Sequence, residues 1–119
     1  MATIKSYTDI NQSKKLAEIL PIESADKWYS IVDGEPFVCL ERHCDYEQIP
    51  CWSLASLLGV LPKNLNIGRP SLESNYKGYY WVQYYDEYMK PSNNKTECFN
   101  NSIDACVAMI EKLHELKML

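Results

Sequence analysis

The sequence has only four glycines among its 119 residues, and they are well separated from one another. Phosphate-binding loops of the P-loop and Rossmann types need clustered glycines, because their backbone must approach the phosphates closely. Their absence excludes nucleotide binding through either motif. A basic surplus is missing too, since sixteen acidic and twelve basic residues give a net charge of −4. The bases are scattered and form no stripe that could displace counterions from phosphates, so we expect no nucleic-acid partner.

Long hydrophobic runs are also absent. The longest uncharged apolar stretch, residues 49–62, falls short of the roughly 20 residues that a helix needs to cross a bilayer. Residues 1–7 lack the basic and then apolar pattern of a signal peptide. We therefore expect a cytoplasmic protein with no membrane contact. The cysteine count of five is odd, and without an export signal it predicts free thiols.

What is present is typical of a globular α+β protein. Hydrophobic residues make up 46% of the chain and charged residues 24%, which suits one domain over residues 1–119. Apolar spacing, turn residues and caps define the elements. We expect three helices at about 10–20, 51–61 and 102–117, a β-hairpin at 28–42, a loop at 61–76 and a long strand at 78–88. These elements predict a small antiparallel sheet, formed by the hairpin and the long strand, packed with the three helices.

The long strand is the most distinctive segment. Six of the nine tyrosines lie between residues 76 and 88. Because side chains alternate along a strand, Tyr79, Trp81 and Tyr85 share one face, while Tyr84 lies on the other. Tyrosine and tryptophan are enriched at interfaces and in ligand pockets. These four residues are therefore candidate binding residues, for a protein partner or for a small ligand, and the plain alternative is a well-packed sheet.

The last predicted helix is apolar over about half of its circumference, which exceeds the stripe of roughly 100° on an ordinary surface helix. It either wedges between two elements or meets another chain. In the second case Met109, Leu113 and Leu116 are interface candidates, and the protein is a homodimer.

Cysteine and histidine gather between residues 39 and 51. Cys39, His43, Cys44 and Cys51 are zinc-ligand types, but their spacing matches no standard zinc knuckle. A catalytic reading places Cys51 at the start of the predicted helix 51–61, where the dipole would stabilise a thiolate and His43 would act as its base. The alternative is that these residues are structural. We expect no cofactor, and we favour a binding role over catalysis.

Three stretches, LPIESAD at residues 20–26, IPCWSLASLL at 49–58 and DAC at 104–106, resemble a group of small bacterial proteins associated with phage or other mobile elements. This resemblance covers most of the chain. It implies an intracellular accessory role and brings no activity, catalytic residue or cofactor with it. The sequence thus predicts a non-enzymatic interaction module that binds a protein partner or itself. A small Cys/His-centred enzyme or zinc protein and a small-ligand binder are the alternatives.

Overall fold

The structure, a computed structural model, describes residues 5–32, 34–41, 47–64 and 66–119. Its three helices and two antiparallel three-stranded sheets confirm the predicted α+β class. The contacts divide the chain into two compact units. The N-terminal unit is Ser6–Val60, and the C-terminal unit is Leu61–Leu119 together with Lys5. The single domain over residues 1–119 stays a prediction.

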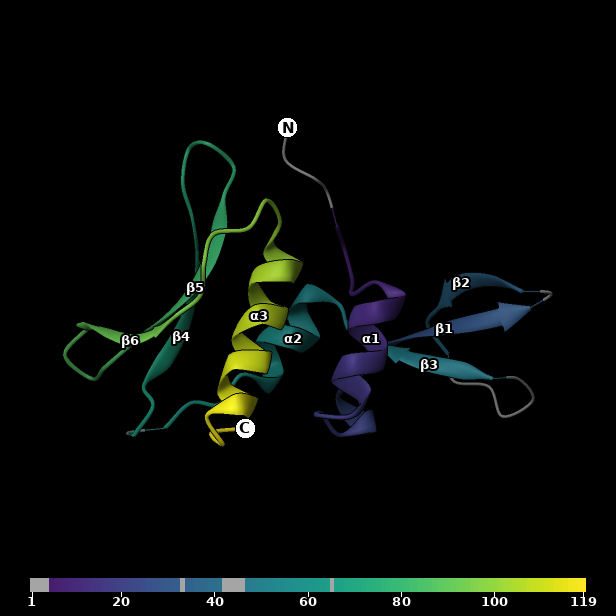
Figure 1. The fold of residues 1–119 in the computed structure, drawn as a ribbon, viewed down its shortest axis with the longest axis horizontal. Coiled ribbons are helices and arrows are strands. Elements are labelled where there is room, and N and C mark those ends of the chain that lie inside the picture. The colour runs from purple at the N-terminus through teal and green to yellow at the C-terminus, as the bar shows by residue number, and fades with distance from the viewer. Residues whose placement is uncertain (1–4, 33, 42–46, 65) are drawn as a thin grey trace. The chain divides into compact units, whose positions relative to one another are not determined.

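The N-terminal unit contains helices α1 and α2, a short 3₁₀ helix η1 and the sheet β2-β1-β3 (Figure 1). The bounds are α1 Ile10–Ala17, η1 Ile22–Ser24, β1 Lys27–Val32, β2 Glu35–Cys39, β3 Gln48–Cys51 and α2 Leu54–Val60. Asp9 and Gln12, whose residue types and spacing suit a helix start, form a capping box in which each side chain accepts a hydrogen bond from the backbone N–H of the other residue. Helix α1 packs against β3, and the core is centred on Leu16, Trp52 and Leu57.

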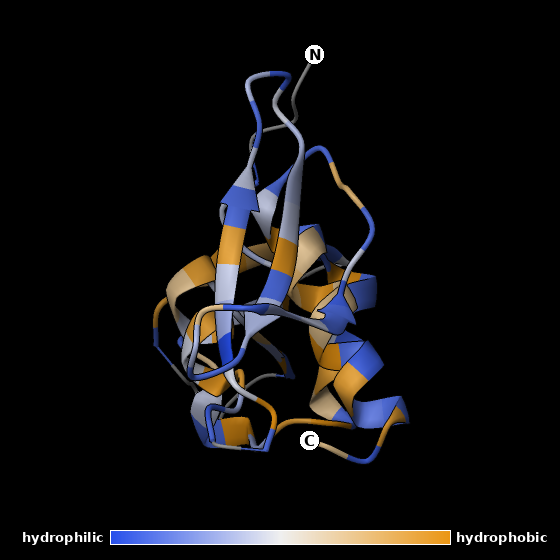
Figure 2. Cartoon of the chain, turned by 90° about the vertical axis from the view of Figure 1, so that its left-hand side faces the viewer, coloured by the Kyte–Doolittle hydropathy of each residue, from blue (hydrophilic) through white to orange (hydrophobic). Residues whose placement is uncertain are grey.

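The C-terminal unit contains the sheet β4-β5-β6 and helix α3. The bounds are β4 Arg69–Ser74, β5 Tyr80–Tyr85, β6 Pro91–Lys95 and α3 Ser102–Glu115. Helix α3 contacts β4 and β5 on one side of the sheet, where Val82 and Tyr84 are fully buried. Figure 2 looks onto the opposite side, along strands that are coloured mainly pale to blue with short orange segments. The sheet therefore has a core face toward α3 and a second, outer face.

The prediction of one sheet is wrong, because the hairpin and the tyrosine strand lie in separate sheets. The hairpin gains β3 as its third strand, and β5 lies between β4 and β6. Strand β4 replaces part of the loop predicted at 61–76, and β6 lies in a segment for which no strand was predicted. The sequence PSNNK of β6 contains no apolar side chain apart from Pro91, so no alternation could reveal it.

The second helix is also shorter than predicted. Cys51 belongs to strand β3, and α2 begins only at Leu54. Ser53 caps this helix, since its hydroxyl accepts a hydrogen bond from the backbone N–H of Ser56. The carboxylate of Asp26 in turn accepts from the hydroxyl and the backbone N–H of Ser53. Burial acts to raise the pKa of Asp26, but these hydrogen bonds outweigh it and hold the pKa below its ordinary value.

Within the described residues, every edge strand of the two sheets contains a proline, and the central strands β1 and β5 contain none. The four are Pro36 in β2, Pro50 in β3, Pro70 in β4 and Pro91 in β6. Proline has no N–H to donate to an added strand, so each edge is a poor template for pairing with another chain. Among the same residues, no helix is long and apolar enough to cross a bilayer.

Candidate functional site

Trp81 and Tyr85 lie on the outer face of the sheet β4-β5-β6 and are held there by one carboxylate. Oε1 of Glu73 accepts a hydrogen bond from Nε1 of Trp81 at 3.2 Å and another from the hydroxyl of Tyr85 at 2.7 Å. The hydrogen bond to Glu73, with smaller contributions from desolvation and the carboxylate charge, raises the pKa of Tyr85. Both rings are half-buried, so each still presents area to solvent.

Two further residues border these rings. Nζ of Lys95 lies 5.7 Å from the centroid of the Trp81 ring, within the range of a cation–π interaction. Tyr79 directly precedes β5 and, because side chains alternate along a strand, belongs to the same face as Trp81 and Tyr85. Its side chain is 45% exposed. We define the aromatic surface as Tyr79, Trp81 and Tyr85 with Glu73 and Lys95.

Tyr84, the fourth predicted binding residue, lies in the core. Its side chain is fully buried, and its hydroxyl donates a hydrogen bond to the backbone carbonyl of Pro62 at 2.8 Å. Burial raises its pKa. The structure thus brings Tyr79, Trp81 and Tyr85 to one surface and places Tyr84 where it has no access to a ligand.

A pocket continues the aromatic surface at its Tyr85 end. Its volume is about 490 Å³. Arg69, which lies opposite Tyr85 in the β4–β5 register, forms part of its wall. The remaining lining residues are Lys63, Asn64, Gly68, Asp86 and Glu87. Sequence reasoning missed this pocket because β4, which supplies Arg69, falls within the segment predicted to be a loop.

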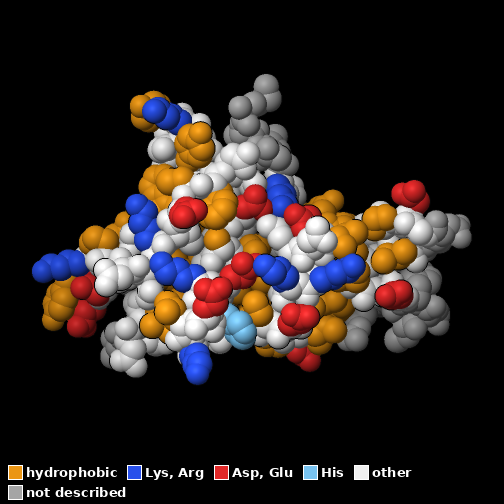
Figure 3. Space-filling view, viewed as in Figure 1, with side chains coloured by type: hydrophobic (Ala, Val, Ile, Leu, Met, Phe, Trp, Pro, Cys, Tyr) orange, Lys and Arg blue, Asp and Glu red, His pale blue; other side chains and the backbone are white. Residues whose placement is uncertain are grey.

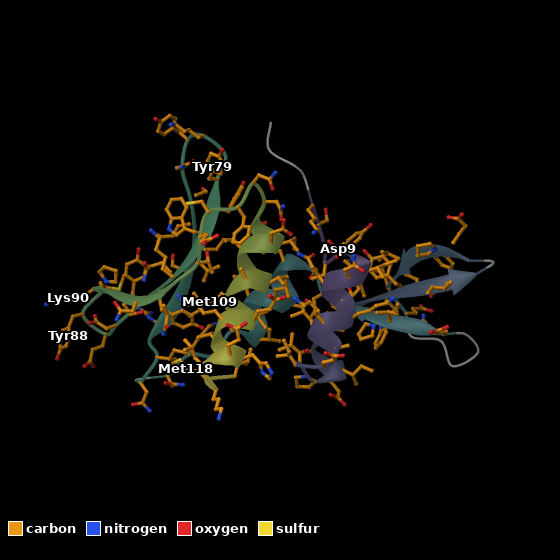
Figure 4. All side chains as sticks on the ribbon, viewed as in Figure 1. Asp9, Tyr79, Tyr88, Lys90, Met109 and Met118 are labelled. Atoms are coloured by element: carbon orange, nitrogen blue, oxygen red, sulfur yellow. The ribbon has the colours of Figure 1, made fainter. Side chains whose placement is uncertain are left out.

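The turn between β5 and β6 presents two exposed hydrophobic side chains that sequence reasoning also missed as a site. Tyr88 is 75% exposed and Met89 is 64% exposed. Figure 4 labels Tyr88 and Lys90 at the far end of this hairpin, and Figure 3 shows hydrophobic side chains there beside acidic and basic ones. We call residues 86–90 the β5–β6 tip.

The interface candidates on α3 divide between core and surface. Met109 and Leu113 are fully buried, so they offer no contact area to another chain. Leu116, at the C-cap of α3, is 49% exposed. The broad apolar arc of α3 is therefore mainly core, and of the three interface candidates only Leu116, at the C-cap, remains exposed.

Cys51 lacks the environment of a reactive nucleophile. Its thiol is fully buried on β3 and donates a hydrogen bond to the backbone carbonyl of Thr8 at 3.5 Å. Burial raises the pKa of the Cys51 thiol, against the predicted stabilisation of a thiolate by a helix start. The predicted base His43, together with Cys44, lies outside the described residues.

The zinc hypothesis has two of its four residues, Cys39 and Cys51, in the described part of the chain. Sγ of Cys39 lies 3.0 Å from the hydroxyl of Ser30 and accepts from Nε2 of Gln48 at 3.4 Å. Among the described residues, no three cysteine, histidine or acidic side chains are grouped so that they could hold a metal ion.

Thiol labelling tests the assignment of Cys51 to the core. Among the four cysteines that the structure describes, we expect Cys98, which is exposed, to react first and the half-buried Cys39 to follow. Cys51 and Cys106 should react on the order of a hundredfold more slowly, because they become accessible only when the structure opens. Burial also raises the pKa of Cys106, to about 12. Peptide mass mapping after timed alkylation measures each site, and labelling of Cys51 as fast as Cys98 would contradict the assignment.

No protein-family model, curated protein or solved structure matches the chain. The resemblance to small bacterial proteins of phage and other mobile elements stays a prediction.

Proposed function

We propose that the chain is a non-enzymatic interaction module that binds a protein partner through the aromatic surface. The observation that carries this proposal is the shared carboxylate of Glu73, which holds the side chains of Trp81 and Tyr85 in place before any partner arrives. The role inside the cell that we propose for it is that of an accessory protein of a phage or other mobile element.

Fixed rings favour binding for a thermodynamic reason. Immobilising a flexible side chain at an interface costs about 0.5–1.5 kcal/mol, and that cost is reduced when the side chain is already ordered. Tryptophan and tyrosine also head the residues that contribute most to binding energy at protein interfaces. A tryptophan and a tyrosine anchored on one face of a sheet therefore fit the centre of a binding surface.

The prolines in the edge strands favour binding of a partner to the outer face of the sheet rather than to a sheet edge. Partners that add a strand to a sheet need a row of free backbone N–H and C=O groups. A proline in each of β2, β3, β4 and β6 removes one backbone N–H from that row. Side chains on the outer face, rather than backbone at the edges, are thus the groups that a partner would meet.

A second candidate function is the binding of a small ligand at the same place. The pocket beside Tyr85 has a volume of about 490 Å³, within the range of roughly 300–1,000 Å³ that is usual for small-molecule sites. Its wall carries charges of both signs, from Lys63 and Arg69 and from Asp86 and Glu87. A zwitterionic ligand is the chemistry that such a wall would favour.

The test of the interaction module compares two exposed rings. Tyr79 in the aromatic surface is 45% exposed, and Phe37 on β2 of the other sheet is 47% exposed. We expect Tyr79→Ser to weaken association by at least about tenfold, whereas Phe37→Ser should leave it unchanged. Sedimentation velocity measures self-association, and capture on the immobilised chain measures binding of other proteins. An equal loss in both variants, or a wild-type chain that associates with nothing, would contradict the proposal.

A further inference from the structure

We infer that the partner is a second copy of this chain, with the β5–β6 tip of each copy inserted into the pocket beside Tyr85 of the other. This inference rests on the proposed function and specifies its partner.

The first step of the argument is that the tip is rigid. Oδ1 of Asp86 accepts hydrogen bonds from the backbone N–H groups of Tyr88 and Lys90 at 2.8 and 2.9 Å. The backbone closes the turn further, since Asp86 N donates to Lys90 O at 2.9 Å and Met89 N to Asp86 O at 3.0 Å. Four hydrogen bonds within five residues fix the tip, so it loses little conformational freedom on docking.

The second step concerns backbone strain and exposed hydrophobic side chains at this tip. Met89 has a φ of 62°, in the left-handed region where glycine and asparagine are the usual residues. A side chain there costs roughly 1–2 kcal/mol. The sulfur of Met89 accepts a hydrogen bond from Nη2 of Arg69 at 3.5 Å, yet the side chains of Met89 and Tyr88 remain largely exposed. Strain of this kind is concentrated at functional sites, where another requirement outweighs stability.

The third step is the position of the pocket. Asp86 and Glu87, which begin the tip, also line the pocket, so the tip and the pocket adjoin each other on one patch of the C-terminal unit. A two-fold axis brings the same patch of two copies together, so that each tip meets the pocket of the other copy. A pocket of about 490 Å³ has room for the ring of Tyr88.

The fourth step is charge. The wall of the pocket carries two bases, Lys63 and Arg69, and two acids of the tip, Asp86 and Glu87. A two-fold axis that places Glu87 of each copy beside Lys63 and Arg69 of the other pairs opposite charges at both ends, so the patch is complementary to itself. A lipid surface fits less well, because anionic membranes attract basic segments and this tip carries Asp86 and Glu87 against a single lysine, Lys90.

The first experiment measures the dimer dissociation constant by sedimentation equilibrium. Tyr88→Ser removes the inserted ring, and Tyr76→Ser removes a ring that is 94% exposed in the turn between β4 and β5, at the other end of β5. We expect Tyr88→Ser to weaken the dimer by about 30-fold or more and Tyr76→Ser to leave it unchanged. A dimer that both variants weaken equally, or that Tyr88→Ser does not weaken, overturns the inference.

The second experiment exploits the two-fold symmetry. In a dimer of Lys63→Glu, the new acid of each copy faces Glu87 of the other. In a dimer of Glu87→Lys, the new base of each copy faces Lys63 of the other. Like charges repel at both ends in either case, so each variant alone should be mainly monomeric. In an equimolar mixture both ends regain opposite charges, and we expect native mass spectrometry to show a mixed dimer with close to wild-type affinity. Recovery in the mixture cannot arise from misfolded chains. A mixture that stays monomeric, or single variants that dimerise like the wild type, overturns the inference.

The outcomes also separate this inference from the proposed function. A monomeric chain that binds another protein, or vesicles rich in anionic lipid, through Tyr88 overturns the second copy as partner. If Tyr79→Ser abolishes the binding of another protein to that monomer, the proposed function survives. If the chain neither self-associates nor binds any protein through the aromatic surface, both are overturned.

Discussion

Replacing Gly68 with alanine is expected to lower the free energy of unfolding by more than about 2 kcal/mol, because two penalties coincide at this residue. Gly68 has a φ of 91°, which L-amino acids with a side chain rarely adopt. A Cβ atom at Gly68 would also lie 2.2 Å from the backbone oxygen of Tyr85 and 3.0 Å from its carbonyl carbon. Neither atom can move away like the end of a side chain, so the backbone of β4 or β5 must shift.

Substitutions at two other glycines distinguish the penalty of a positive φ from the penalty of a steric clash. Gly34 has a φ of 80° but open space where a Cβ atom would lie, so Gly34→Ala should cost only the conformational penalty of about 1–2 kcal/mol. Gly59 is an exposed residue of α2, also with open space, and Gly59→Ala should stabilise the protein by about 0.5–1 kcal/mol. Urea unfolding of the three variants measures the series. A loss at Gly68 no greater than that at Gly34 would show that the contact with Tyr85 is not limiting.

Gly68→Ala also connects stability to the proposed site. Gly68 and Tyr85 both line the pocket, and Asp86, which follows Tyr85, anchors the β5–β6 tip. A backbone shift at Tyr85 would therefore displace the pocket and the tip together. We expect the dimer of Gly68→Ala to be weakened even under conditions in which the variant is fully folded.

The parts of the fold that the sequence predicts are those with strong local chemistry. The Asp9–Gln12 capping box, the glycine turn at Gly34 and the aromatic run of β5 each determine structure within a few residues. The edge strand β2 was predicted as part of the hairpin, but β3, β4 and β6 were not, because they are short, each contains a proline, and β4 and β6 are mostly polar. Pro50 illustrates the ambiguity, since it suits both the first turn of a helix and an edge strand.

The candidate site was predictable only in part, for a related reason. Alternation along one strand places Tyr79, Trp81 and Tyr85 on one face without any knowledge of the tertiary structure. Glu73 belongs to β4, so its bridge between two rings depends on the pairing of distant residues. The burial of Met109 likewise depends on how many elements cover α3, which the width of its apolar arc does not reveal.

Truncation of the largest core side chains is expected to cause the other large loss of stability. Trp52 in the N-terminal unit and Tyr84 in the C-terminal unit are both fully buried. We expect Trp52→Ala and Tyr84→Ala each to lower the free energy of unfolding by about 3–5 kcal/mol. Tyr84→Phe is the matched control, since it keeps the ring and removes only the hydrogen bond to the carbonyl of Pro62, at a cost of about 1 kcal/mol.

The same two variants test whether residues 1–119 form one domain. Each unit has roughly 60 residues, and a domain of that size hides only about 60% of its unfolded surface, which leaves little stability. A single domain predicts that either truncation shifts one common transition, because neither unit would stay folded without the other. Hydrogen exchange by mass spectrometry locates the loss. If the amides of α3 stayed protected in Trp52→Ala while those of β1 exchanged, the two units would be separate domains, and the rigid tip and pocket would belong to a C-terminal domain that folds alone.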